Sequence, residues 1–264
     1  MGNDEQIVMS DAAWAWEGLR RNPDYRRAWK HHASQVPTLC DRRASLRYIR
    51  YEKPFLEAEV FGLVGFADPD HSASEVPVFW LPNLLCRTLE VSLSVAEEGR
   101  SDGFSLASLK CCPIVLDTPD GQRHVRLGGH DFWIQMVSED LVALDDETRI
   151  EVRLTGTDAF PERIVSAEQL FSLHRSDDGF PAPAKRPPNR EKLMEGLLAW
   201  DVYSGEGGRK GSLKDIAVAL FGKERVETEW AFNRSLKNHA VRARDRGRAF
   251  VRDGYRDYLR RATF

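Results

Sequence analysis

Basic and amide side chains are concentrated near the C-terminus in a pattern suited to hydrogen bonding with nucleic acid. Between Phe232 and Arg261 there are 10 Lys and Arg residues and 3 Asp residues, a net charge of +7. Arginine and lysine can donate hydrogen bonds to guanine, asparagine can pair with adenine, and the remaining basic groups can neutralise phosphates. The side chains that we expect to contact DNA in this way are Arg234, Ser235, Lys237, Asn238, Arg242, Arg246 and Arg248.

A helix is needed to hold these side chains on one surface, and the sequence predicts one from about Asn233 to Asp253. The basic residues fall on the flanks and the opposite side of a helical wheel from the apolar and small residues. The small residues among them would allow a close approach to a neighbouring element. The predicted buried face consists of Leu236, Ala240, Ala243, Gly247 and Phe250.

Two predicted helices come before the basic one. Apolar residues at helical spacing from Leu193 to Trp200 indicate the first, and Ser212 with Asp215 forms a capping box that starts the second, which ends at Gly222. A capped helix followed by a basic helix is the order of a helix-turn-helix. The connection over residues 223–232 is longer than the usual three or four residues, so we predict a variant of that motif.

Charge is divided unequally along the chain. Residues 185–264 carry 19 Lys and Arg against 11 Asp and Glu, a net of +8, whereas residues 1–184 carry a net of −11. A basic segment on an acidic body indicates a polyanionic partner for that segment. Charge alone does not separate DNA from RNA or from an acidic protein.

The N-terminal region predicts two short helices around a sharp turn. Asp11 is expected to cap the first, and Asn22 the second, with Pro23 in its first turn. Aromatic residues recur at helical spacing and are expected to lie in a core: Trp14, Trp16, Tyr25 and Trp29. The basic residues beside them have three alternative partners, namely DNA, another protein or the acidic middle region: Arg20, Arg21, Arg26, Arg27 and Lys30.

The middle of the chain predicts strands. Residues 88–95 and 149–154 alternate apolar and polar side chains, and two short apolar runs flank a turn at Pro119–Gly121. We therefore predict an α+β fold with an N-terminal helical pair, a small mixed or antiparallel central sheet and a C-terminal helical module. The predicted division is residues 1–53, 54–175, a Pro-rich spacer at 176–190, and 191–264.

Other classes of protein lack support in the sequence. No run of about 18 apolar residues and no secretory signal is present, so we expect a cytoplasmic protein without a membrane span. Catalytic motifs such as a Walker loop, GxSxG or HExxH are absent, which predicts no enzymatic activity and no cofactor. The residues His31, His32 and Cys40, and likewise Cys111, Cys112, His124 and His130, lack the spacing of zinc ligands, so no metal site is expected.

Three stretches resemble a known family. Trp14–Trp29 (WAWEGLRRNPDYRRAW) resembles the Trp-rich signature of a small N-terminal domain in bacterial regulators. Ser212–Gly222 (SLKDIAVALFG) and Gly254–Leu259 (GYRDYL) resemble the helix-turn-helix-variant domain at the C-termini of such regulators. In this order the chain resembles the FseA-type transcriptional activators of integrative and conjugative elements, over roughly residues 10–32 and 124–261.

The resemblance implies an activator that switches on genes for excision and conjugative transfer and is held in check by small anti-activator proteins. We expect the C-terminal module to bind promoter or operator DNA. The N-terminal helices and the central sheet would then contact RNA polymerase, another protomer or an anti-activator. The alternative hypothesis is a non-enzymatic interaction adaptor whose basic module docks on an acidic protein partner.

Overall fold

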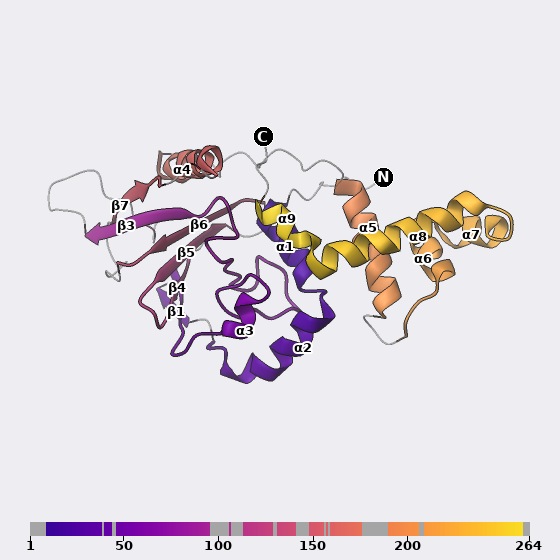
Figure 1. Ribbon diagram of the computed structural model, residues 1–264, viewed down its shortest axis with the longest axis horizontal. Coiled ribbons are helices and arrows are strands. Elements are labelled where there is room, and N and C mark those ends of the chain that lie inside the picture. The colour runs from indigo at the N-terminus through magenta and orange to yellow at the C-terminus, as the bar shows by residue number, and fades with distance from the viewer. Residues whose placement is uncertain are drawn as a thin grey trace.

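A mixed β-sheet and several groups of helices make up the structure, a computed structural model, and they confirm the predicted α+β class (Figure 1). The structure describes residues 9–38, 40–43, 46–95, 106, 113–128, 131–140, 148–155, 157, 159–175, 190–205 and 209–260. Most of the predicted Pro-rich spacer lies outside these residues. The sheet occupies one end of the molecule and helices α5–α8 the other (Figure 1).

The described strands form a seven-stranded sheet in the order β1-β2-β4-β5-β6-β3-β7. Neighbours are antiparallel except for β2 with β4 and β3 with β6, which are parallel. Gly121, at φ +86°, closes the predicted turn between β4 and β5. The strands are β1 (Cys40–Arg43), β2 (Leu46–Arg50), β3 (Leu89–Val95), β4 (Ile114–Asp117), β5 (Arg123–Gly128), β6 (Trp133–Ser138) and β7 (Thr148–Arg153).

Helix α4 (Phe160–Arg175) packs on the sheet through Leu170 and Leu173, which share a core with residues of β3, β5 and β6. Helices α1 (Asp11–Leu19), α2 (Pro23–His32) and α3 (Leu56–Glu59) lie beside the sheet, with the short helix η1 (Ala33–Gln35) after α2. Strands β1 and β2, which precede residue 54, belong to the same sheet as the later strands. The domain boundaries stay a prediction.

The N-terminal helices begin close to the predicted positions, but the residue that caps α1 differs from the prediction. Ser10, not Asp11, caps α1, because its hydroxyl accepts a hydrogen bond from Ala13 N at 3.2 Å. Asn22 caps α2, and Pro23 occupies its first turn, as predicted. The predicted aromatic core is also confirmed: Trp14, Trp16 and Tyr25 are buried, and Trp29 is partly buried against them.

The C-terminal helices return to this N-terminal core. Helix α5 (Arg190–Ser204) is followed by α6 (Leu213–Phe221), α7 (Lys223–Glu229) and α8 (Arg234–Ala249). A π-helical turn, Phe250–Gly254, then leads into α9 (Tyr255–Arg260), which packs against α1. The apolar core at this joint includes Trp16 and Leu19 of α1, Trp200 of α5 and Tyr255 of α9.

Asn22 ties the π-helical turn to the N-terminal helices. Its Oδ1 accepts hydrogen bonds from Asp24 N at 2.8 Å and Tyr25 N at 3.3 Å. Its Nδ2 donates to Val251 O at 3.0 Å and to Arg252 O at 3.3 Å. One buried amide therefore caps α2 and anchors the π-helical turn between α8 and α9, and π-helical turns of this kind often mark functional positions.

We predict that Asn22→Asp lowers the free energy of unfolding by about 2 kcal/mol, because a carboxylate keeps the cap but faces two carbonyl oxygens to which the amide donates. Urea denaturation of the full chain measures this loss. Asn22→Ser, which also retains a capping oxygen and adds no charge, should lose less. Equal stability of the wild type and Asn22→Asp would show that the amide contributes nothing to the joint.

Candidate nucleic-acid interface

Helix α6 has the start and stop that the sequence predicts. Ser212 Oγ accepts from Asp215 N at 3.2 Å, and the Asp215 carboxylate accepts from Ser212 N at 2.7 Å, which completes the capping box. The hydrogen bonds that Ser212 N and Ser212 Oγ donate to the Asp215 carboxylate, both at 2.7 Å, lower the pKa of that carboxyl. Gly222 ends the helix at φ +85°, a conformation that glycine adopts without steric cost.

The long connection predicted between α6 and the basic helix is wrong, because residues 223–229 form helix α7. Gly222 turns the chain directly from α6 into α7, and Val226 of α7 is buried in the same core as Ile216 of α6. An ion pair between residues four positions apart also stabilises the helix, with Arg225 Nε 3.3 Å from Glu229 Oε1. The link to α8 is therefore only residues 230–233.

Helix α8 follows the predicted pattern of burial. Asn233 caps it by accepting from Leu236 N at 3.0 Å. The predicted apolar face is buried against α5 and α6 at Leu236, Ala240, Ala243 and Gly247, and Phe250 is buried at the joint beyond the helix. At the crossing with α5, a Cβ added to Gly247 would lie 2.0 Å from the Gly196 carbonyl oxygen, so the two helices are in backbone contact.

The opposite face of α8 presents polar and basic side chains to solvent. Arg234, Asn238 and Arg242 are exposed and lie four residues apart, which places them one above another on a helix. Ser235 and Arg248 are also exposed. Within the described part of the chain, no hydrogen bond or ion pair engages Arg234, Arg242 or Arg248, so their guanidinium groups are available to an external anion.

Two of the predicted contact residues have partners inside the protein. Arg246 Nη2 donates to Glu195 Oε2 of α5 at 3.1 Å, and His239 shares the same carboxylate oxygen at 3.0 Å. The Lys237 ammonium donates to Ala231 O at 3.3 Å and lies 5.6 Å from the centre of a Trp230 ring. These side chains brace α8 against α5 and against the preceding turn.

The N-terminal arginines lie away from this face and are largely engaged within the protein. Arg20 and Arg26 both donate to Pro69 O, and Arg26 pairs with Asp70, so the acidic middle region is a partner of both. Arg21 pairs with Asp201 of α5 at 2.8 Å. Arg27 is exposed and pairs with Asp24 of its own helix at 3.1 Å, and Lys30 is exposed.

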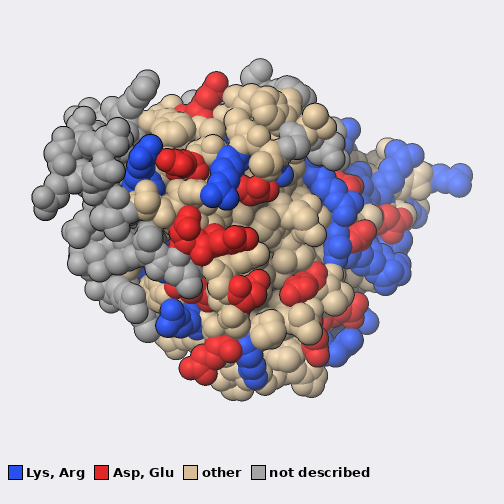
Figure 2. All heavy atoms as spheres, turned by 60° about the vertical axis from the view of Figure 1, so that its left-hand side comes forward, with Lys and Arg blue, Asp and Glu red and all other residues tan. Residues whose placement is uncertain are grey.

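Basic side chains gather over the helical module on the molecular surface. Figure 2 shows Lys and Arg clustered at that end, whereas the face of the body mixes acidic and basic side chains. The sequence prediction missed one part of this surface, at the start of α6. Arg209, Lys210 and Lys214 are exposed there, and their run just before and after the Ser212 cap was the available signal.

Other kinds of site find little support among the described residues. No three His, Cys, Asp or Glu side chains there could together hold a metal ion, and Cys111, Cys112 and His130 lie outside the described residues. Burial lowers the pKa of His124 to about 4. No helix among the described residues is both long and apolar enough to span a bilayer.

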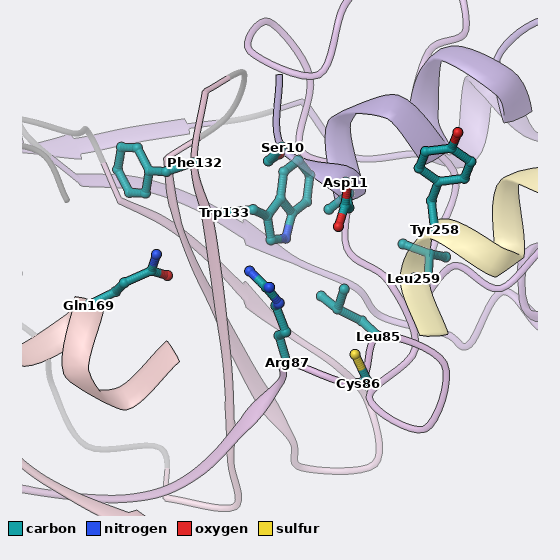
Figure 3. A pocket seen from close by; sticks show the side chains of 11 residues that line it. Ser10, Asp11, Leu85, Cys86, Arg87, Phe132, Trp133, Gln169, Tyr258 and Leu259 are labelled. Carbon is teal, nitrogen blue, oxygen red and sulfur yellow. The ribbon is translucent and has the colours of Figure 1, made fainter. Parts of the chain in front are cut away.

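A cavity of about 20 Å³ lies at the joint of the sheet with α1 and α9 (Figure 3). Residues from several elements line it, including Ser10, Cys86, Trp133, Gln169 and Leu259. A cavity of this size has room for little more than one water molecule. This cavity therefore offers no room for a larger ligand.

Comparison with known families agrees with a DNA-binding role for the C-terminal region. Residues 145–260 match a family model described as a T6SS transcription factor DNA-binding domain. This match spans β7, α4 and α5–α9, and it includes all seven candidate DNA-contact residues. Residues 8–47 match a proteobacterial transcriptional regulator-like domain, which spans α1 and α2. No curated protein matches the chain. The two family matches support a transcription regulator that binds DNA through its C-terminal region.

Proposed function

We propose that the chain is a sequence-specific transcriptional activator that places the exposed face of α8 in the major groove of double-stranded DNA. The main support for the proposal is that α8 exposes unpaired arginines, Arg234, Arg242 and Arg248, on one side while its other side is buried against α5 and α6. The major groove is wide enough for one helix, and its base edges differ for each base pair. A helix fixed on its inner side is suited to present such contacts.

The individual roles follow from chemistry and exposure. Arg234 and Arg242 would donate to guanine or to phosphate, and Asn238 would pair with adenine. Ser235 and Arg248 would contact the backbone, as would Arg209, Lys210 and Lys214 beside α6. In this proposal α7, the four-residue link and α8 form a variant helix-turn-helix. Lys237 and Arg246 contribute mainly by holding α8 in place.

The regulatory context is also a proposal. The resemblance to FseA-type activators favours promoters of excision and conjugative-transfer genes, with RNA polymerase and a small anti-activator as protein partners. The description of the DNA-binding family model names type VI secretion (T6SS), which provides a second class of promoter to test. A second protomer on a neighbouring half-site is compatible with either class.

Selection from a random-sequence pool of duplex DNA tests the proposed function. The full chain should enrich one sequence. If the protein neutralises about four phosphates, a plot of the logarithm of the binding constant for that duplex against the logarithm of the salt concentration should have a slope near −4. A reporter carrying the enriched sequence should then be activated in cells. Failure to enrich any sequence, together with capture of one stoichiometric acidic protein, would favour the adaptor hypothesis.

The N-terminal basic residues provide a control in the same assay. We expect Arg27→Ala with Lys30→Ala to leave affinity for the selected duplex unchanged, because both residues lie on α2 rather than on α8. A loss of affinity would show that α2 is a second nucleic-acid contact.

A further inference from the structure

Phe232 is the most exposed large apolar side chain among the described residues, at 75%. It lies in the four-residue link, directly before the Asn233 cap of α8. The backbone around it is fixed, because Phe232 N and Asn233 N both donate to Glu229 O, at 3.2 and 2.8 Å. An ordered turn therefore holds an aromatic ring in solvent.

The Phe232 ring does not make the packing contact that is common for an apolar residue at this position. An apolar residue just before a helix cap commonly packs against the fourth helical residue, which fixes the entry of the chain into the helix. Here that fourth residue is Lys237, whose ammonium lies over the Trp230 ring and donates to Ala231 O. The fourth residue is therefore a lysine engaged at Trp230 and Ala231, and it gives Phe232 no apolar partner.

The surroundings of Phe232 indicate the kind of partner that would cover it. Arg234, exposed and unpaired, follows two residues later, and Asn238 and Arg242 continue along the same helix. An aromatic ring at the start of this basic face suits a polyanion that also offers an apolar group. In the major groove that group is the C5 methyl of thymine.

We propose that Phe232 is a specificity-determining residue that packs on a thymine methyl beside the bases contacted by the start of α8. The inference rests on the proposed function, since it requires α8 to enter the major groove. Recognition helices contact base edges mainly through their N-terminal residues, and in α8 these begin two residues after Phe232. The contact would select thymine without any hydrogen bond.

Deoxyuridine substitution tests the contact, because it removes only the methyl group. The probe is the duplex selected by the wild-type chain, synthesised with each thymine replaced singly by deoxyuridine. One position should weaken wild-type binding by about fourfold, the value expected for one lost buried methyl. Phe232→Ala should weaken binding to the unmodified duplex by at least as much and should be insensitive to deoxyuridine at that position.

Two control variants sharpen the result. Phe232→Leu keeps an apolar contact and should retain part of the thymine preference. Phe171→Ala removes an exposed aromatic residue of α4, 45% exposed, and should leave DNA binding unchanged.

The outcomes separate this inference from the proposed function. If a duplex is selected and arginine variants of α8 lose affinity, but Phe232→Ala binds as the wild type does, the inference is wrong and the proposed function stands. If Phe232→Ala weakens binding and no deoxyuridine position does, the ring contacts another part of the DNA and the thymine assignment is overturned. If no duplex is selected, the proposed function itself fails.

Discussion

Replacing Arg234 and Arg242 together with alanine should weaken binding to the selected duplex by about a thousandfold, since each specific arginine–base contact contributes about 1–3 kcal/mol. The two residues are eight positions apart, roughly 12 Å along the helix, so their effects should be nearly additive. Both side chains are exposed and unpaired among the described residues, so the stability of the fold should change by less than about 0.5 kcal/mol. Retardation assays and urea denaturation measure the two quantities.

The charge change itself requires a matched control. Arg27→Ala with Lys30→Ala removes the same charge from α2 and should preserve affinity. If both double variants lose affinity equally, the attraction is a general effect of net charge and α8 is not the specific contact. Arg246→Ala provides a contrast, because it breaks the pairing with Glu195 and should reduce stability more than selectivity.

Gly247→Ala should lower the free energy of unfolding by about 3 kcal/mol, the upper part of the range for overpacking a core. The added Cβ would lie 2.0 Å from the Gly196 carbonyl oxygen and 3.0 Å from Trp200 Cβ, so α5 and α8 must move apart. Gly196→Ala should cost less, because its Cβ would first meet Gly247 N at 3.1 Å. Urea denaturation of both variants measures which of them loses more free energy of unfolding.

This prediction opposes intrinsic helix propensity, which favours alanine over glycine by about 1 kcal/mol within a helix. A Gly247→Ala variant that is more stable than the wild type would therefore show that the close crossing of α5 and α8 does not exist. A loss of stability accompanied by weaker DNA binding would show that the crossing also sets the position of α8.

Local signals explain what the sequence predicts well. The capping box at Ser212 and the cap at Asn22 depend on side chains three residues or fewer from their partners, and both are confirmed. The buried face of α8 is also confirmed, because its small and apolar residues recur at helical spacing. The alternating strands β3 and β7 pair with each other and are recognisable for the same kind of reason.

Elements without periodicity escape such prediction. Helix α7 has seven residues and buries only Val226, so it shows no apolar stripe. Strand β6 is buried over most of its length and carries Gln135 at its centre, where the amide bonds to the Trp80 backbone at 3.1 and 2.5 Å. A polar residue whose hydrogen-bond partners are backbone groups far away in the sequence interrupts the apolar pattern by which a buried strand is recognised.

The candidate DNA-binding surface is also only partly predictable from local sequence patterns. The sequence identifies a basic helix, but not which of its cations are engaged within the protein. Arg246 pairs with a residue 51 positions earlier, and Arg21 with one 180 positions later. Only the packing of α5 against α8 and against α1 distinguishes these residues from the exposed Arg234 and Arg242.

Photocrosslinking from the exposed face of α8 tests the central claim most directly. A benzoylphenylalanine introduced at Asn238, which is exposed on that face, should crosslink to the selected duplex, and the crosslinked base should lie within the enriched sequence. The same group at Phe171 of α4 should give no crosslink. Crosslinking from Phe171 but not from Asn238, each measured at a protein concentration that saturates the duplex, would contradict the assignment of α8 as the DNA-binding helix.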